Sequence, residues 1–387
     1  MHDVMASSTQ EWRRERRHRQ GEGRLKAYLL DAHASSDDDQ SSILALLQRA
    51  CELQPGASVE ETHDALLFMI YLDNEFLVVD AAEPRFMIVH TAGRAENTDR
   101  FITAATDALP DLDCAWLPSA FLLNSATTIG RLRRGTVRYD NSQLLGQVSA
   151  FEAFPDEIDN EDDVIDDRDG RARGKRLTLD LADPRGARQA LEELSELDYF
   201  RHALALSRVD LLHRDPDSGG EMYSVSRVFD WGKVSAVGTS ADSHLAVLFA
   251  LRHRYQTSIE RIEREFAIYV DQDGQDRGRF HGQPISIRFQ VPIDDIGQFA
   301  RRLFSSRRPF SLWGEPRMRS NNYVTVHGLD LHIGAPIYCE IMPDAIRVYL
   351  QRGTCGNTVA RLYTNLVRHY DASATLYGRG AEDALLQ

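Results

Sequence analysis

Apolar and polar positions follow one recurring pattern along the chain, clearest after residue 284. ISIRFQV (285–291) alternates with a period of two, which predicts a strand. PIDDIGQFARRLF (292–304) opens with proline and acidic residues, which predicts the start of a helix. Three more strands are expected between 323 and 352, and apolar residues spaced three and four apart predict a closing helix at 356–370.

The same order of elements is expected in two earlier segments. The middle segment has a strand at 176–181, a helix at 183–197, further strands, and then GKVSAVG followed by a helix. The first segment is fainter, with a strand at 24–32 and a closing helix at 97–109. Because the three segments have similar lengths and the same order, an internal duplication is expected.

Two polar runs divide the chain, an acidic one at 156–174 and a second one at 272–284. The acidic run has too few apolar residues to offset the entropy of ordering it, so we interpret it as a linker. The domains expected are a basic arm (1–24), an N-terminal α+β domain of one diverged repeat plus an extension (25–155), the acidic linker (156–174), a second repeat (175–271), a polar break (272–284), a third repeat (285–375) and a tail (376–387).

Glycine follows the last strand of each segment, at Gly93, Gly238 and Gly353. Glycine adopts positive φ without strain, which suits an abrupt turn. The side chains expected to cap the helices that follow are Asn97, Thr98, Ser240 and Asn357. An anion site at one of these helix N-termini is the alternative interpretation.

VFDWGKVSAVG (228–238) resembles the strand–turn–strand of TATA-box-binding protein repeats, through Phe229, Gly232, Lys233 and Gly238. The order strand, helix, four strands, helix is also similar to one such repeat, and 175–371 matches a two-repeat saddle in length. The resemblance implies an α+β fold of tandem repeats, with curved antiparallel sheets, helices on one face and a concave face that binds DNA. In that family phenylalanines kink the duplex, and Phe229 alone matches such a position, so kinking is not expected.

Period-two alternation sorts the third segment into two faces. The residues expected beneath the helices are Ile285, Ile287, Phe289, Val291, Val324, Val326, Ile346, Val348 and Leu350. The opposite face is rich in arginine, glutamine and tyrosine, which suit phosphate contacts and base stacking. The residues expected to contact nucleic acid are Phe229, Lys233, Arg288, Gln290, Arg307, Arg308, Trp313, Tyr323, Arg347, Tyr349, Gln351 and Arg352. The solvated side of an ordinary two-layer sheet is the alternative interpretation.

Charge qualifies this hypothesis. The net charge is −14, with 42 arginines but three lysines, and 37 aspartates against 22 glutamates. This usage suits a halophilic cell or a GC-rich genome. An acidic protein is repelled by phosphate in dilute buffer, but at molar salt the Debye length falls to about 3 Å. Affinity for nucleic acid is therefore expected to persist at high salt.

Signatures of other functions are weak in this sequence. The four cysteines form no CxxC pair, so they are expected to be reduced thiols of a cytoplasmic protein. Asp271, Asp273 and Asp276 partly copy a calcium loop, but Gly282 replaces its glutamate. No metal, cofactor or catalytic site is expected. No apolar run reaches the roughly 18 residues that span a membrane.

The function expected is therefore non-enzymatic nucleic-acid binding, DNA before RNA, in a role related to transcription. Two alternatives stay open. One is a protein-interaction or scaffold module that docks a partner on its convex helices. The other is an enzyme or small-ligand protein with a pocket between domains.

Overall fold

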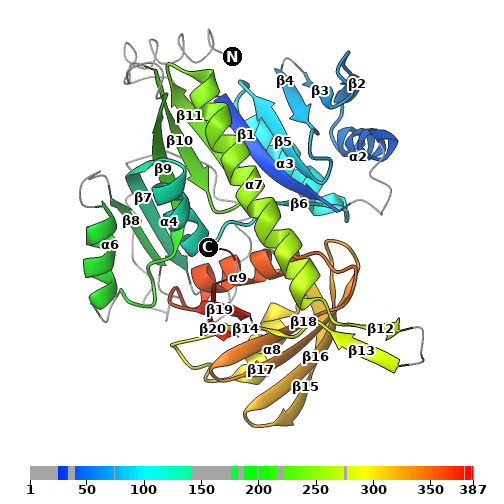
Figure 1. Cartoon of the computed structure of the whole chain (residues 1–387), viewed down its shortest axis with the longest axis vertical. Coiled ribbons are helices and arrows are strands. Elements are labelled where there is room, and N and C mark those ends of the chain that lie inside the picture. The colour runs from blue at the N-terminus through cyan, green and yellow to red at the C-terminus, as the bar shows by residue number, and fades with distance from the viewer. Residues whose placement is uncertain are drawn as a thin grey trace, which may run out of the picture.

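The computed structural model describes residues 25–33, 40–73, 75–140, 176–181, 187–197, 200–215, 222–273, 277–378, 380–384 and 386. Within them, seven helices and antiparallel sheets form an α+β fold (Figure 1). Two expected segments lie outside the described residues: the basic arm (1–24) and the acidic linker (156–174). Residues 141–155, which precede the linker, also lie outside them. Among the helices described, none has the length and apolar character needed to cross a membrane.

The first segment folds as expected, into a strand, a helix, four strands and a helix. The elements are β1 (Leu25–Ala32), α2 (Gln40–Glu52), β2 (Ser58–Glu61), β3 (Leu67–Leu72), β4 (Glu75–Asp80), β5 (Phe86–Thr91) and α3 (Ala95–Ala108). Its strands have the order β2-β3-β4-β5-β1. All of β1 is buried, because Tyr28 and Leu30 pack with α2 and α3 while Ala27 and Leu29 pack in the core on the other side.

The second segment joins the same sheet. Its elements are β6 (Leu112–Cys114), α4 (Ser119–Thr128), β7 (Arg131–Asp140), β8 (Arg176–Leu181), α6 (Ala187–Glu196), β9 (Leu206–Arg214), β10 (Tyr223–Phe229), β11 (Lys233–Gly238) and α7 (Ala241–Phe266). The 11-stranded sheet, here called the large sheet, continues as β1-β11-β10-β9-β7-β8. β6 pairs with the C-terminal end of β1, at Leu30–Ala32.

This arrangement corrects two expectations. The second segment does not form one sheet with the third, so 175–371 is not a continuous two-repeat saddle. Nor is the second segment a copy of the first, because β7 lies between β8 and β9. The physical reason is that β7, from a stretch assigned to no repeat, pairs with both of these strands and separates them.

The third segment forms its own seven-stranded sheet, here called the C-terminal sheet. Its elements are β14 (Ile285–Arg288), α8 (Ile296–Leu303), β15 (Leu312–Ser320), β16 (Tyr323–Asp330), β17 (Pro336–Met342), β18 (Ala345–Leu350), α9 (Asn357–His369), β19 (Thr375–Gly378) and β20 (Gly380–Ala384). A separate two-stranded sheet, β12 (Tyr269–Asp273) with β13 (Arg277–His281), precedes it. The order β15-β16-β17-β18-β14 repeats that of the first segment, with β19 and β20 added where a tail was expected. The β12–β13 hairpin begins before the expected polar break (272–284) and continues into it.

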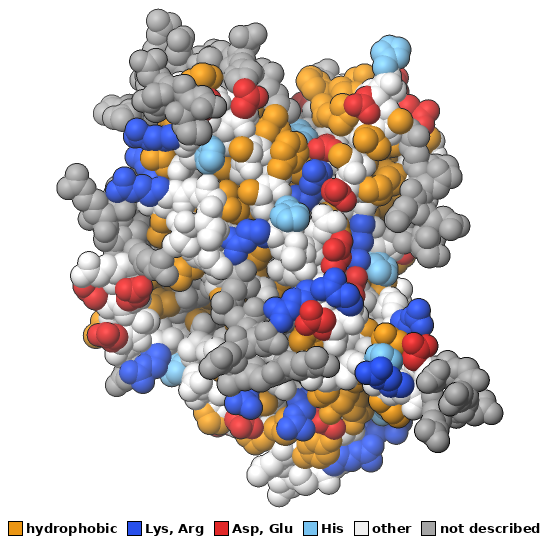
Figure 2. Space-filling view, viewed as in Figure 1, with side chains coloured by type: hydrophobic (Ala, Val, Ile, Leu, Met, Phe, Trp, Pro, Cys, Tyr) orange, Lys and Arg blue, Asp and Glu red, His pale blue; other side chains and the backbone are white. Residues whose placement is uncertain are grey.

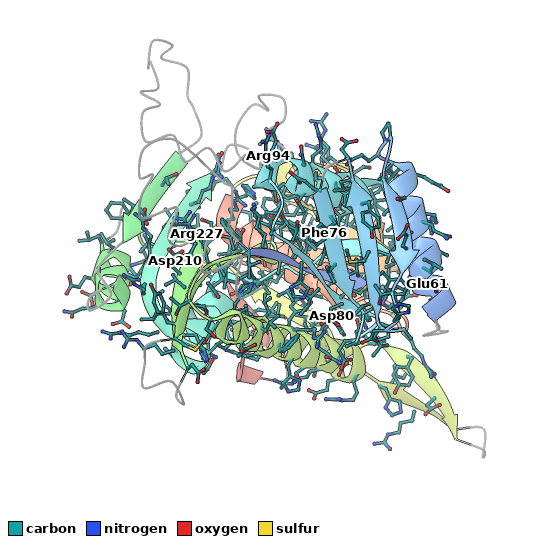
Figure 3. The ribbon with its side chains drawn as sticks, turned by 90° about the horizontal axis from the view of Figure 1, so that it is seen from above. Glu61, Phe76, Asp80, Arg94, Asp210 and Arg227 are labelled. Atoms are coloured by element: carbon teal, nitrogen blue, oxygen red, sulfur yellow. The ribbon has the colours of Figure 1, made fainter. Side chains whose placement is uncertain are left out.

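Helix α7 links the two sheets (Figure 1). It lies on the second side of the first segment, where Tyr255 packs against Phe86 at 5.9 Å between ring centroids. Arg252 of the same helix lies 3.5 Å from Asp80, at the end of β4 that approaches α7 in Figure 3. Its last turns, which include Ile262, enter the core shared with the C-terminal sheet. β1 and β5 are therefore covered on both sides, whereas β3 and β4 alternate buried and more exposed positions.

Local signals at the helix starts and turns are partly as expected. Ser240 caps α7, since its side chain accepts a hydrogen bond from the Ser243 N–H at 3.1 Å. The other caps are wrong: α3 follows Arg94 and α9 follows Gly356, with no side-chain cap at either. Gly232 turns the β10–β11 hairpin at φ +84°, where a Cβ would lie 2.8 Å from the Leu29 carbonyl oxygen. The quoted stretch 228–238 thus has a structural role.

Candidate functional site

The C-terminal sheet has one face that no described helix covers. Its inner face packs against α8 and α9. Of the residues expected there, Val291 lies beyond the end of β14 and is only partly buried, and the others are buried: Ile285, Ile287, Phe289, Val324, Val326, Ile346, Val348 and Leu350. This part of the face assignment is confirmed. The cross-strand register places on the opposite side, here called the outer face, Ser286, Arg288, Trp313, Glu315, Arg317, Tyr323, Thr325, His327, Leu329, Tyr338, Glu340, Arg347 and Tyr349.

Three rings form a row across the middle of the outer face. His327, Tyr338 and Tyr349 are cross-strand neighbours on β16, β17 and β18. The ring centroids of His327 and Tyr338 are 4.7 Å apart, and those of Tyr338 and Tyr349 are 5.1 Å apart. We call these three residues the aromatic row. Because all three are at least partly exposed, their surfaces can accept further rings by stacking.

Glu340 fixes the tyrosines beside this row. Its carboxylate accepts hydrogen bonds from the hydroxyls of Tyr323 at 2.7 Å and Tyr349 at 2.9 Å. The bond to Glu340 raises the pKa of Tyr323, while burial and then the same carboxylate raise the pKa of Tyr349. Both phenols therefore remain protonated hydrogen-bond donors at neutral pH, and their rings are held in one orientation.

Arginines lie around the aromatic row. Arg347 is half exposed and 3.6 Å from Glu340, and the guanidinium of Arg288 lies over the Tyr377 ring at 5.0 Å. Arg288 and Arg347 line a hollow of about 350 Å³ together with Ser286, Met342, Asp344 and Ala345. Figure 2 shows basic and hydrophobic side chains side by side at the lower end of the molecule, where this sheet lies. Cations beside exposed rings are suited to phosphates and bases.

The β12–β13 hairpin extends the surface beside the end of β18. Ile268 pairs with Gln351, and the rings of Tyr269 and His281 stack at 4.8 Å. The guanidinium of Arg352 lies over Tyr269 at 5.1 Å. Phe280 on the same hairpin is 79% exposed. This surface was not expected from the sequence, where the region was interpreted as a polar break. RGRFHG (277–282) nevertheless combines basic and aromatic residues, as the outer face of the third segment does.

The structure brings together some of the predicted contact residues. The five on the outer face are Arg288, Trp313, Tyr323, Arg347 and Tyr349. Gln351 and Arg352 lie at the base of the hairpin, and Arg307 is exposed in the loop before β15. Gln290 is exposed beyond the end of β14, where its backbone N–H donates to Asp371 at 2.6 Å.

Three other predicted residues lie elsewhere. Lys233 is fully buried on β11, and its ammonium donates to Asp99 at 2.7 Å. Rings of Phe229 and Trp231 lie 5.6 Å from that ammonium, so Lys233 and Phe229 have structural roles in the large sheet. Arg308 pairs with Asp107 of α3, and burial followed by Arg361 lowers its pKa to about 10. We leave these three residues out of the proposed interface.

Helix α9 does not offer a docking surface. Every residue from Asn357 to His369 except Arg368 is buried. Arg368 itself lies 3.4 Å from Asp230 of the large sheet. This helix lies between the two sheets, so its own surface is not available to a partner.

Buried charges hold α9 in this position, and the sequence analysis missed them. Arg361 of α9 pairs with Asp113 and Asp330, and Arg85 pairs with Asp31 at 2.9 Å and Glu263 at 2.6 Å. The group also includes Cys355, Asn357 and Thr358. We call this set the polar junction: Asp31, Arg85, Asp113, Glu263, Asp330, Cys355, Asn357, Thr358 and Arg361. Of these residues, only Asn357 was given a role from the sequence, as a helix cap.

Two members of the polar junction, together with the neighbouring His33, have donor groups that suit a metal. Oxygen, nitrogen and sulfur atoms of Asp31, His33 and Cys355 all lie within 4.8 Å of one another. Burial raises the pKa of the Cys355 thiol, so without a cation it stays protonated at neutral pH. Such donors come from chain positions too far apart for a spacing pattern to reveal.

Comparisons with known proteins agree on one family. The model of a family described as MJECL33-like protein matches residues 1–385. The uncharacterized protein MJECL33 of Methanocaldococcus jannaschii is 23% identical over 330 residues, which cover 79% of this chain and 76% of that protein. No solved structure shows a significant match. Since the family model covers nearly the whole sequence, the chain belongs to the MJECL33-like family.

Proposed function

We propose that this protein binds single-stranded nucleic acid, DNA before RNA, on the outer face of its C-terminal sheet. The observation that carries the proposal is the aromatic row, exposed on an uncovered sheet face and bordered by arginines. Bases of a single strand can stack on such rings, whereas the bases of a duplex are already stacked on one another. The preference for DNA continues the expectation from the sequence.

The chemistry of the outer face suits sequence-tolerant binding. Stacking of one base on an aromatic side chain contributes about 1–3 kcal/mol. Arg288 and Arg347 provide phosphate contacts, whose strength falls with salt. Since the net charge of −14 opposes phosphates at low ionic strength, the rings contribute most of the affinity. Affinity is therefore expected to persist between low and molar KCl.

Fluorescence anisotropy with labelled oligonucleotides tests this proposal. Single-stranded DNA, duplex DNA and RNA of one sequence are titrated with protein at several KCl concentrations. Replacement of both Tyr338 and Tyr349 by alanine is expected to weaken binding of single-stranded DNA at least 30-fold, corresponding to about 2 kcal/mol or more. Tyr71→Ala is the matched control, because Tyr71 is an exposed tyrosine on β3 of the large sheet.

Two results would contradict the proposal. One is the absence of binding to every probe at every salt concentration. The other is unchanged affinity in the Tyr338 and Tyr349 double variant. Tighter binding of the duplex than of the single strand would instead favour groove binding of the kind that the TATA-box-binding protein resemblance implies.

We also propose that the first and third segments are two copies of one repeat similar to those of TATA-box-binding protein. The support is their shared connectivity, in which the first strand pairs with the fifth and the helices follow the first and fifth strands. An experimental structure in which β1–α3 and β14–α9 have different strand orders, and therefore do not superimpose, would contradict it.

A protein partner is the second candidate, and one observation favours it. The β12–β13 hairpin exposes Phe280 and Val270, which are 79% and 52% exposed. Large apolar side chains on a projecting hairpin are typical of contact surfaces. Replacement of Phe280 by serine would weaken nucleic-acid binding if the hairpin belongs to the same interface, and would leave it unchanged if the hairpin serves a partner.

A further inference from the structure

Two donors of a possible metal site, Asp31 and His33, come from the end of β1 and the residue after it, at the polar junction. His33 directly follows the strand, and its donor atom lies within 4.8 Å of that of Asp31. Cys355 lies in the turn before α9. Its thiol hydrogen-bonds to Asp31 at 3.5 Å, although 324 positions separate the two residues. The fold thus brings three different donor types together.

A fourth group beside them lacks a partner. His332, in the turn between β16 and β17, is 5% exposed, and neither ring nitrogen has a hydrogen bond. Its backbone N–H donates to Asp330 of the polar junction at 3.1 Å, so the residue lies at the junction. A buried imidazole without partners is costly, because both nitrogens lose their bonds to water. The structure therefore offers a buried imidazole without partners at the same polar junction.

We propose that Asp31, His33 and Cys355 bind a divalent transition metal such as Zn²⁺, with His332 as the fourth donor. Thiolate, imidazole and carboxylate are the ligands of tetrahedral zinc, whereas calcium and magnesium take oxygen ligands. Donors of a tetrahedral zinc ion lie roughly 3.3–3.8 Å apart, as ligand distances of 2.0–2.3 Å require. The cluster must therefore contract by about 1 Å, a shift within the reach of side-chain rotation.

The charges around the cluster are consistent with a divalent cation. Asp31 and Glu263 carry two negative charges, and Arg85 carries one positive charge. Binding adds two positive charges, and the thiol of Cys355 releases its proton to solvent as the sulfur–metal bond forms. The sum over these groups then becomes zero. Arg85 remains hydrogen-bonded to Asp31 and orients that carboxylate, as groups behind metal ligands commonly do.

The position of the site indicates its consequence. Asp31 and His33 belong to the large sheet, whereas Cys355 and His332 belong to the third segment. A metal bound by all four joins the two parts of the fold. Because it binds the folded chain, it should raise the unfolding temperature progressively as the concentration of free metal increases. This site is independent of nucleic-acid binding on the outer face.

Metal titration of the full chain tests the inference. The protein is treated with a chelator, dialysed, and titrated with Co²⁺ while its absorption spectrum is recorded, and Zn²⁺ is then added in competition. Bound Zn²⁺ is measured by elemental analysis. The variants are Cys355→Ser, His33→Gln and His332→Gln, with Cys51→Ser and His253→Gln as controls at a buried thiol and an exposed imidazole outside the cluster.

We expect one equivalent of metal, a thiolate-to-cobalt charge-transfer band that Cys355→Ser abolishes, and affinity at least tenfold lower in each histidine variant. Both controls should match the parent protein. Absence of bound metal in the parent, or a band that persists in Cys355→Ser, would overturn the proposal. If Cys355→Ser fails to fold, unchanged affinity in both histidine variants overturns it. Unchanged affinity in His332→Gln alone removes His332 as a ligand.

Discussion

The first and third segments have the same strand order but different coverage of their sheets. In the first, α2 and α3 pack on one side while α7 packs on the other at β1 and β5. Every residue of these two strands is therefore buried, whereas β3 and β4 keep exposed positions. In the third, α8 and α9 pack on one side, and no described helix covers the outer face. The comparison shows that a shared connectivity does not locate a binding surface. The surface exists where one side of the sheet stays open.

The amino-acid patterns of corresponding strands record this difference. β5 is FMIVHT and is buried throughout, whereas β18 is AIRVYL and alternates buried positions with the more exposed Arg347 and Tyr349. Ile88 and Arg347 are the third residues of these two strands. This pair offers a direct way to test what covers each face.

The largest expected effect is on stability. Ile88→Ala should lower the free energy of unfolding by about 2–5 kcal/mol, because Ile88 is fully buried in the core on the α7 side. Arg347→Ala, at the corresponding place on β18, should change it by less than about 1 kcal/mol, because its side chain is half exposed. Denaturant unfolding of both variants measures the difference. Equal losses would show that both faces are covered.

The second effect is on binding. Tyr338→Ala should weaken single-stranded DNA binding by about 1–3 kcal/mol, since it removes the central ring of the aromatic row. Phe76→Ala, at an exposed ring on β4 of the large sheet (Figure 3), should leave affinity within twofold. Anisotropy titrations compare the two. Equal losses would place the interface on both segments.

A smaller effect concerns salt. Arg288→Ala should weaken binding at low KCl and reduce the slope of log Kd against log salt by about 0.7, the value for one phosphate contact to a single strand. Affinity at molar KCl should hardly change. An unchanged slope would mean that the hollow between Arg288 and Arg347 does not hold a phosphate.

The smallest effect concerns the orientation of one ring. Tyr349→Phe removes the hydrogen bond to Glu340 but keeps the stacking surface. We expect a loss of affinity below fivefold, much less than for Tyr349→Ala. If the phenylalanine variant loses as much as the alanine variant, the hydroxyl contacts the ligand directly.

Sequence patterns predicted the third segment well because the period-two alternation there reflects a sheet with one buried and one open face. Ile285, Ile287, Val324 and Val326 therefore identified the inner side without knowledge of their partners. In β1 both sides are buried, so LKAYLLDA shows no alternation. The pairing of β7 with β8 and β9 could not be foreseen, because the stretch that contains β7 matched none of the repeats.

Residues whose role depends on distant partners were missed or misplaced. Lys233 was assigned to a surface, yet its ion-pair partner Asp99 lies 134 positions away and holds it in the interior. Asn357 was interpreted as a cap, whereas it bonds to Asp113, 244 positions away. Local spacing carries no information on such pairs, since the fold alone brings them together.

The most direct measurement is photo-crosslinking of single-stranded DNA that carries a halogenated uracil, followed by mass spectrometry of the crosslinked peptides. The account predicts crosslinks to Tyr338 and Tyr349, and their loss when unlabelled single strand competes. Crosslinks confined to the large sheet, or to no specific peptide, would contradict binding on the outer face.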